Sequence, residues 1–202
     1  SITKSMKKPP PWAEPTEQTR ADHYTDWGTP QCNDRVLFEY ILLDSFQAGL
    51  SWAIILNKRE NFRSAFAGFD PKKITRYDKR RVASLLKDAG IVRNRGKIEA
   101  TISNAKNFLA IQKEFGSFSK YLWGMIGNSP RPRKASPRGK QNKWRRLEDV
   151  PARTREGDEI SADLKKRGFR FFGPTTCYAF MQGAGLVNDH LVSCFRHKEC
   201  VQ

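Results

Sequence analysis

A short segment near residue 50 combines an acidic side chain with an indole ring. Asp44 and Trp52 flank a stretch that is rich in small residues. An indole offers a plane for stacking, and a carboxylate accepts hydrogen bonds from an exocyclic amine, which are the two things a flipped-out nucleobase needs. A cationic base also gains from electron-rich rings. The segment therefore predicts a base pocket with Asp44 and Trp52 as its catalytic residues. The alternative is a core tryptophan and a surface aspartate at the end of a helix.

The segment from Leu85 to Ile98 predicts two helices joined by a tight turn. Gly90 permits the positive φ that such a turn often needs. Free amides at the start of the second helix, flanked by basic residues, form a site for phosphate groups. A helical hairpin of this kind holds a DNA backbone without reading its sequence. The residues expected to contact DNA are Gly90, Ile91, Val92, Arg93, Asn94, Arg95 and Lys97. The alternative is an ordinary helical hairpin with a basic rim.

Three possible metal ligands lie near the two ends of the chain. His190 and Cys194 have a spacing that places both on one face of a helix, and His23 lies near the start of the chain. Together they could hold a metal that joins the terminal segments, but a structural zinc site requires four ligands. Cys200 and His197 are the remaining candidates. The alternative is a surface histidine and a buried cysteine without metal.

The charge of the chain points to a polyanionic partner. Lys and Arg number 37 against 21 Asp and Glu, which gives a formal net charge of +16 at pH 7. The alternatives are a surface suited to solubility or to ribosome binding. No stretch approaches the ~18 apolar residues of a membrane span, and the N-terminal residues do not form a signal peptide. We expect a cytoplasmic, nucleoid-associated protein without membrane contact, whose four cysteines are free thiols or metal ligands.

The apolar residues recur at helical spacing over most of the chain, which predicts an all-α fold. A helix expected from Asn33 or Asp34 through Asp44 is apolar on most faces, as is typical of a core helix. Other helices are expected to start at Ser161 and at Thr175 or Thr176. No segment shows the alternation of a convincing strand.

The domain organisation follows from composition. Residues 1–30 are Pro-rich and polar and are expected to form an arm that packs on a helical domain of residues 31–202. Residues 129–147 contain eight Lys or Arg and no acidic residue, so they predict a mobile loop that tethers the protein to DNA phosphates. The alternative is a disordered surface insertion.

Several motifs occur in one order, and together they resemble the 3-methyladenine DNA glycosylase I family. They are DHYTDWGTP (22–30), FQAGLSW (46–52), DAGIVRNRGKI (88–98) and GLVNDH (185–190). The resemblance runs from about Trp12 to Cys194. It implies a helical fold of the helix–hairpin–helix glycosylase superfamily. It also implies hydrolysis of the N-glycosidic bond of 3-methyladenine in DNA.

The resemblance also assigns roles to single residues. It implies that Trp52 stacks on the base and that Trp12 and Trp27 surround it. Asp44 stands where the family usually has a Glu that contacts the base. His23, His190 and Cys194 match three of the four family zinc ligands.

The chain departs from the family pattern at three positions. Pro10 replaces the fourth zinc ligand, a cysteine, so the expected cofactor is at most one structural zinc. Asp22 replaces a pocket tyrosine, and Tyr24 is close enough in sequence to substitute for it, so both are expected to bind the base. Asp44 is one methylene shorter than Glu. Changed base-edge contacts can shift the preferred lesion away from 3-methyladenine.

The resemblance and the residues agree on the mechanism. Most glycosylases of the superfamily use an Asp shortly after the hairpin, but this chain has none between Asp88 and Asp149. An alkylated base is a cationic leaving group, so flipping and orientation can suffice. We therefore expect a monomeric, monofunctional glycosylase of double-stranded DNA. It needs no catalytic cofactor and has no lysine that forms a Schiff base, so it should lack lyase activity. The alternatives are a noncatalytic binder of damaged bases and a generic RNA-binding protein.

Overall fold

The protein is mostly helical. A computed structural model describes residues 17–127 and 138–200, and Pro10 and Trp12 therefore lie outside the described residues. The helices are α1 (Glu17–Thr25), α2 (Asp34–Gln47), α3 (Trp52–Asn57), α4 (Arg59–Ala65), α5 (Pro71–Ile74), α6 (Lys79–Leu85), α7 (Arg95–Phe115), α8 (Phe118–Met125), α9 (Arg155–Lys166), α10 (Pro174–Gly183) and α11 (Phe195–Glu199). Short 3-10 helices span Ala67–Phe69 and Leu147–Asp149. The prediction of an all-α fold is confirmed. The described residues also contain one short two-stranded sheet.

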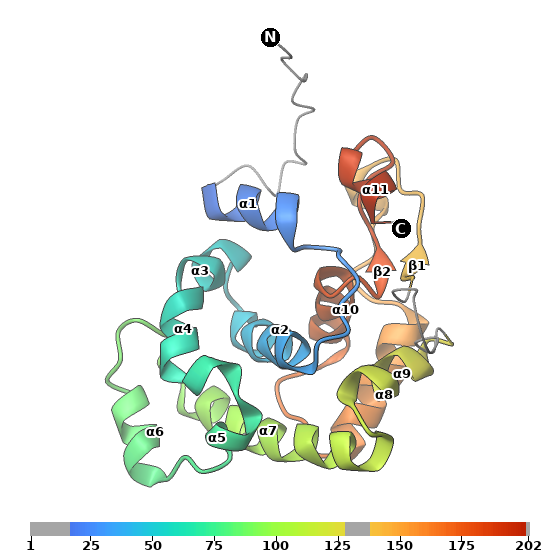
Figure 1. The fold of residues 1–202 in the computed structure, drawn as a ribbon. Helices are drawn as coiled ribbons and strands as arrows, with labels where there is room; N and C mark the ends of the chain where they lie inside the picture. Colours follow the sequence, from blue (N-terminus) through green and yellow to red (C-terminus); the bar gives the residue numbers. More distant parts are fainter. Residues whose placement is uncertain (1–16, 128–137, 201–202) are drawn as a thin grey trace.

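Helix α2 is the centre of the fold (Figure 1). Every residue from Leu37 to Phe46 is buried, because α3, α7, α8 and α10 all contact this helix. The side chain of Asn33 caps its first turn. The Asp34 carboxylate accepts hydrogen bonds from the amides of Phe118 and Ser119, which joins the starts of α2 and α8. Helix α2, which is apolar on most faces, therefore lies in the core, as the sequence predicted.

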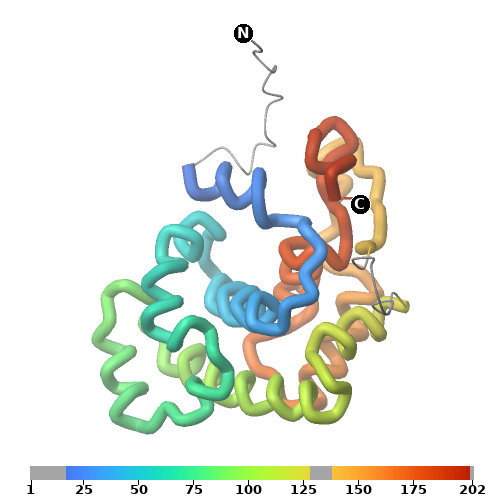
Figure 2. Tube along the Cα trace, viewed as in Figure 1, coloured from blue at the N-terminus to red at the C-terminus, as the bar shows by residue number. Residues whose placement is uncertain are grey.

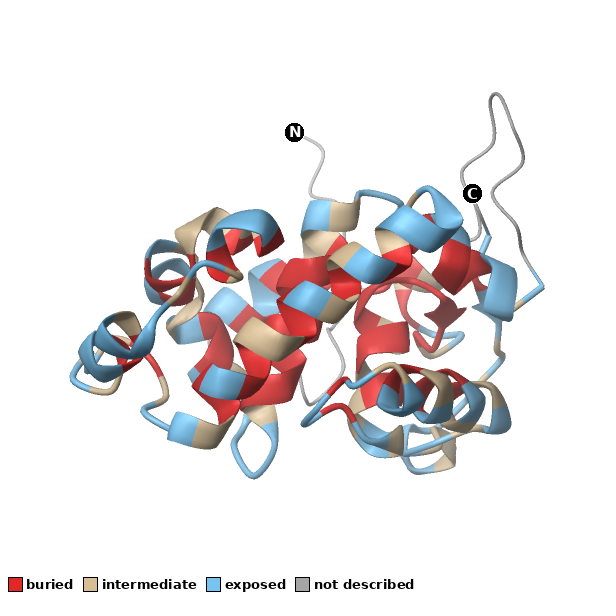
Figure 3. Ribbon diagram, turned by 90° about the horizontal axis from the view of Figure 1, so that it is seen from below, coloured by how far each residue is buried: buried red, intermediate tan, exposed pale blue. Residues whose placement is uncertain are grey.

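The remaining helices lie on two sides of α2. Helices α3 to α6 form one side, whereas α8, α9 and the strands form the other, and α7 crosses beneath both (Figure 1). Buried residues concentrate where these helices meet, and the outer faces are exposed (Figure 3). This arrangement leaves the end of α2 that carries Asp44 between α3 and α10.

The N-terminal segment contains a helix that its polar composition did not suggest. Residues 17–25 form α1, which contacts α3 and buries Thr19, Asp22 and His23. Along the chain trace, α1 and α11 lie at the same end of the molecule (Figure 2). Arg196 strengthens this contact by donating a hydrogen bond to the Thr29 hydroxyl at 2.7 Å.

The described part of the basic segment 129–147 is held against the helical domain. Residues 129–137 of this segment lie outside the described residues. The remainder is fixed, because β1 (Lys140–Gln141) pairs in parallel with β2 (Val187–Asn188). Trp144 donates an indole hydrogen bond to Asp189 at 2.8 Å. The expectation of a mobile loop is therefore wrong for residues 138–147.

Two predicted helix starts are displaced. Helix α9 begins at Arg155 with Thr154 as its cap, so Ser161 lies inside the helix and donates a hydrogen bond to the carbonyl of Phe172. Helix α10 begins at Pro174, because proline suits the first helical turn, where its missing N–H is not needed.

Candidate functional site

A cavity of about 250 Å³ opens beside the buried end of α2. Its lining comes from α2, α10, the start of α3 and the segments that follow α1, β1 and β2. The lining residues are Trp27, Tyr40, Asp44, Gln47, Trp52, Leu147, Val150, Ala179, Gln182, Gly183 and Asp189. The cavity thus combines two indoles with a small number of polar groups, which is typical of a site for a small aromatic ligand.

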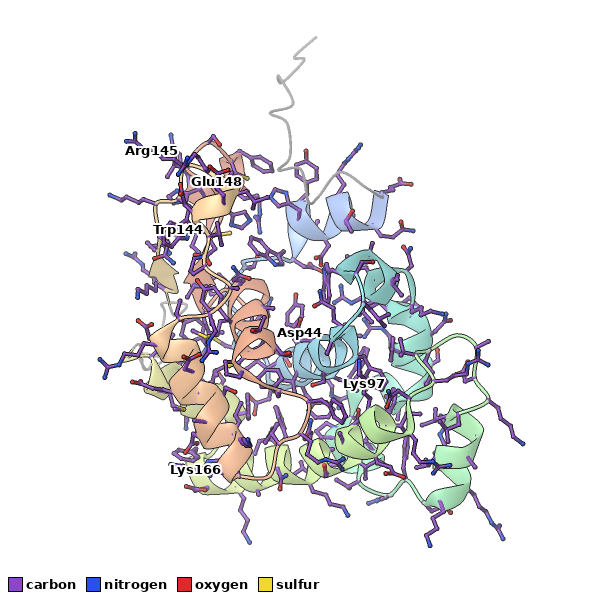
Figure 4. The ribbon with its side chains drawn as sticks, turned by 180° about the vertical axis from the view of Figure 1, so that it is seen from behind. Asp44, Lys97, Trp144, Arg145, Glu148 and Lys166 are labelled. Atoms are coloured by element: carbon purple, nitrogen blue, oxygen red, sulfur yellow. The ribbon has the colours of Figure 1, made fainter. Side chains whose placement is uncertain are left out.

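One face of α2 supplies three polar side chains to the cavity. Tyr40, Asp44 and Gln47 are spaced by four and three residues, so they lie along the same face of the helix. Asp44 lies near the centre of the molecule, whereas Arg145 and Glu148 lie at its edge (Figure 4). The sequence prediction named only Asp44. Tyr40 and Gln47 could have been found by applying the helical spacing to that residue.

Trp52 is held in place by the first turn of α3 and by an aspartate from α1. Ser51 caps this helix by accepting a hydrogen bond from the amide of Ile54. The Trp52 indole donates a hydrogen bond to Asp22 Oδ2 at 3.2 Å. Asp22 itself is absent from the cavity lining, so its direct contact in the structure is with the indole. It is therefore placed to orient the Trp52 indole.

The Asp44 carboxyl is buried without a neutralising partner among residues 17–127 and 138–200. Burial raises its pKa well above the ordinary value of 3.8, and the nearby Asp22 carboxylate raises it further. The pKa of Asp22 is also raised, chiefly by burial, although the Trp52 hydrogen bond opposes this shift. A ligand that brings a positive charge or a hydrogen-bond donor to Asp44 would relieve the cost of burying its charge.

Trp27 and Tyr24, both predicted to bind the base, differ in where their side chains lie. Trp27 lines the cavity, and its ring stands edge-on to His190 with centroids 4.7 Å apart. Tyr24 is absent from the lining and stacks on Phe195, with centroids 5.3 Å apart. Residues two apart on a helix point about 200° apart. Tyr24 therefore cannot substitute for Asp22, and its prediction as a base contact is corrected.

Asp189 fixes the wall of the cavity. Its carboxylate accepts hydrogen bonds from Tyr178 at 2.5 Å, Gln182 at 2.9 Å and Asn142 at 2.7 Å, in addition to the Trp144 indole. These bonds tie α10 to the segment that carries Leu147 and Val150. The prediction from sequence missed Asp189, because its partners converge only in the folded chain.

The comparisons with known proteins agree with this geometry. A family model described as methyladenine glycosylase matches residues 12–197. The chain belongs to this family. DNA-3-methyladenine glycosylase 1 of Escherichia coli (strain K12) is 42% identical over 174 residues, which are 86% of this chain and 88% of that protein.

Solved structures of family members share the fold. A crystal structure of 3-methyladenine DNA glycosylase I has a TM-score of 0.85 and 40% identity, covering 93% of this chain and 98% of the other. A structure that concerns 3-methyladenine recognition by the Staphylococcus aureus protein has a TM-score of 0.82 and 32% identity, covering 90% and 92%. The predicted resemblance to this family is thus confirmed.

The three expected zinc ligands lie close together at the contact between the terminal segments. His23 Nε2 lies 3.5 Å from Cys194 Sγ, and the rings of His23 and His190 are 5.2 Å apart. Burial is the main reason that the pKa of His23 falls to about 4 and that of His190 to about 3, so both rings are neutral at pH 7. In the described part of the chain, no three His, Cys, Asp or Glu side chains are arranged to hold a metal ion. Pro10 carries no ligating atom, so these residues do not fit a four-ligand zinc site.

The predicted DNA-binding hairpin is present between α6 and α7, with two corrections. Arg93, Asn94 and Arg95 are exposed, whereas Ile91 is buried and Val92 packs against the core. Gly90 does not have a positive φ. The position is crowded instead, because a Cβ atom would lie 3.0 Å from Asn61 Cγ and from Asp88 Oδ1, so a larger residue would require these side chains to shift.

Lys97 is the second correction. Its side chain is buried and its Nζ donates hydrogen bonds to the carbonyl oxygens of Phe46 at 2.9 Å and Ala48 at 2.8 Å. These carbonyls end α2, where a positive charge is favoured. Lys97 lies inside the molecule, close to α2 (Figure 4), so its predicted contact with phosphate is wrong. Its sequence position beside Arg93 and Arg95 concealed this structural role.

The hairpin yields a paired prediction. Arg93→Ala should weaken binding to undamaged duplex DNA for every sequence and reduce the slope of log affinity against log salt by ~1. Lys97→Met should instead lower the free energy of unfolding by about 1–3 kcal/mol, because two buried carbonyls lose their donor. Salt-dependent binding and thermal unfolding of both variants test this difference. A fully stable Lys97→Met protein that binds DNA as poorly as Arg93→Ala would contradict the assignment.

The terminal cluster yields a second prediction. Because the donor set lacks a fourth ligand, we expect well under one zinc per purified chain. Treatment with a chelator should leave the unfolding temperature unchanged. Metal analysis and thermal unfolding provide the measurement. Stoichiometric zinc whose removal destabilises the protein would show that another residue completes the site.

Proposed function

We propose that this protein is a monofunctional DNA glycosylase that removes 3-methyladenine or a related alkylated adenine from double-stranded DNA. The observation that carries the proposal is the cavity in which the Trp52 indole adjoins the buried Asp44 carboxyl. The exposed basic residues of the α6–α7 hairpin and the net charge of +16 support a DNA partner. The names of the relatives, which are DNA-3-methyladenine glycosylases, support the same activity.

The cavity favours a base that is both flat and cationic. A base swung out of the duplex stacks on Trp52, and its exocyclic amine donates to Asp44. Its positive charge offsets the cost of burying that carboxylate. An uncharged base lacks this gain, so the site selects for alkylation at a ring nitrogen.

The hydrolysis needs little acid–base assistance from the chain. When the bond between C1′ and the ring nitrogen breaks, its electron pair neutralises the positive base, which leaves uncharged. A water molecule adds to C1′ and loses a proton, and an abasic site remains. The absence of an Asp between Asp88 and Asp149 is compatible with this route, in which orientation supplies most of the catalysis.

The product is expected to remain an uncleaved abasic strand. Lys97, the buried lysine beside the hairpin, donates hydrogen bonds to two carbonyl oxygens and is therefore unavailable to form a Schiff base.

Within the described residues, no helix is long and apolar enough to cross a membrane. We infer a monomer that works at the nucleoid, where its substrate lies.

The proposal is tested by incubating the protein with methylated DNA and identifying the free bases that appear. Trp52→Ala should reduce release of 3-methyladenine roughly tenfold to a hundredfold, because base–aromatic stacking is lost. Trp52→Phe keeps an aromatic plane and should retain most of the activity. Binding to undamaged DNA should be unchanged in both variants.

Two outcomes would contradict the proposal. Release by Trp52→Ala at the parental rate would show that the base binds elsewhere. Tight binding of methylated DNA without any free base would instead favour a noncatalytic binder, the alternative suggested by the replacements at Asp22 and Asp44.

A further inference from the structure

The Tyr40 hydroxyl is a polar group of the cavity that neither the sequence analysis nor the proposed reaction uses. Tyr40 lies one helical turn before Asp44 on α2 and lines the same cavity. The residue is 4% exposed overall and lines the cavity, where a hydroxyl group without a protein partner is available to a bound ligand.

The structure gives this hydroxyl group no such partner. None of the hydrogen bonds among residues 17–127 and 138–200 involves it, whereas the hydroxyl groups of Tyr77, Tyr121 and Tyr178 all donate to oxygen atoms. Burial raises the pKa of Tyr40, and the carboxylates of Asp22, Asp26 and Glu39 raise it further, against the opposing effect of Arg59. The phenol is therefore neutral and retains a proton that it can donate.

Other polar groups of the cavity are already engaged. The Trp52 indole N–H donates to Asp22, and the Gln182 amide donates to Asp189. Among the lining side chains of the described chain, Tyr40 and Gln47 are therefore the ones whose donors have no hydrogen bond assigned, and Asp44 is an acceptor without a donor. Tyr40 and Asp44 thus present a donor and an acceptor side by side on one helix face.

This pair matches the edge of adenine. On its Watson–Crick edge, adenine presents an acceptor at N1 beside the N6 amino donor, whereas guanine presents a donor at N1 beside the acceptor O6. Resting on the proposed function, we propose that Tyr40 is a specificity-determining residue: its hydroxyl group donates to a ring nitrogen of the flipped adenine while Asp44 accepts from the amino group. A guanine in the same position would direct O6 at the Asp44 carboxylate, and this unfavourable contact excludes it.

The test compares release of 3-methyladenine and 3-methylguanine from the same methylated duplex. Tyr40→Phe should reduce release of 3-methyladenine about tenfold to a hundredfold, because a buried acceptor of the base is left unpaired. Release of 3-methylguanine should be no lower than in the parent, so the ratio of adenine to guanine release falls. The unfolding temperature should not fall, because the hydroxyl group has no partner in the free protein.

Tyr24→Phe is the matched control. It removes a hydroxyl group from a tyrosine that stacks on Phe195 outside the cavity, so both rates should equal those of the parent. A parental rate of 3-methyladenine release by Tyr40→Phe would overturn the inference and would make Gln47 the donor. An equal loss of both bases, with a lower unfolding temperature, would show that Tyr40 acts only in folding. If the parent protein itself releases no 3-methyladenine, the proposed function fails first, and this result is distinct from the others.

Discussion

A carboxyl group buried inside a core helix is the constraint on which the rest of the site depends. Asp44 lies near the C-terminal end of α2, where neighbouring helices remove it from water, and no partner in the described structure neutralises it. A raised pKa means that the carboxyl favours the folded state below its ordinary value of 3.8 and loses that contribution as pH rises through the higher folded value. At pH 7 an ionised Asp44 thus lowers the stability of the free protein. In the proposed function, a cationic base with an amino donor offsets this penalty, so that the site favours a charged base over an uncharged one.

The surroundings of Asp44 hold the cavity open in a fixed shape. Asp22 orients the Trp52 indole from one side, and Asp189 fixes α10 and the segment after β1 from the other. Lys97 binds the carbonyls that end α2, just beyond Asp44. Rigid support of this kind reduces the ordering that a ligand would otherwise have to bring about on binding.

The parts predicted from the sequence are those that local patterns determine. The apolar spacing predicted α2 as a core helix, and the motif around Trp52 predicted a pocket, which the structure has with Asp44 and Trp52 in its lining. The helical hairpin was also predicted, but its lysine was misassigned, because sequence position does not show whether a side chain points to solvent or to a helix end. Tyr24 was misassigned because α1 was not recognised as a helix. Two partners of Asp189, Asn142 and Trp144, precede it by 47 and 45 residues, and such convergence leaves no local pattern.

The pKa of Asp44, measured by NMR titration of its carboxyl carbon, tests the central claim most directly. In the free protein we expect titration well above 3.8. Binding of a duplex that carries an uncleavable, cationic methylated adenine nucleotide should lower that pKa, because the positive base stabilises the ionised carboxylate. An ordinary value near 3.8 that does not respond to the methylated duplex would contradict the account.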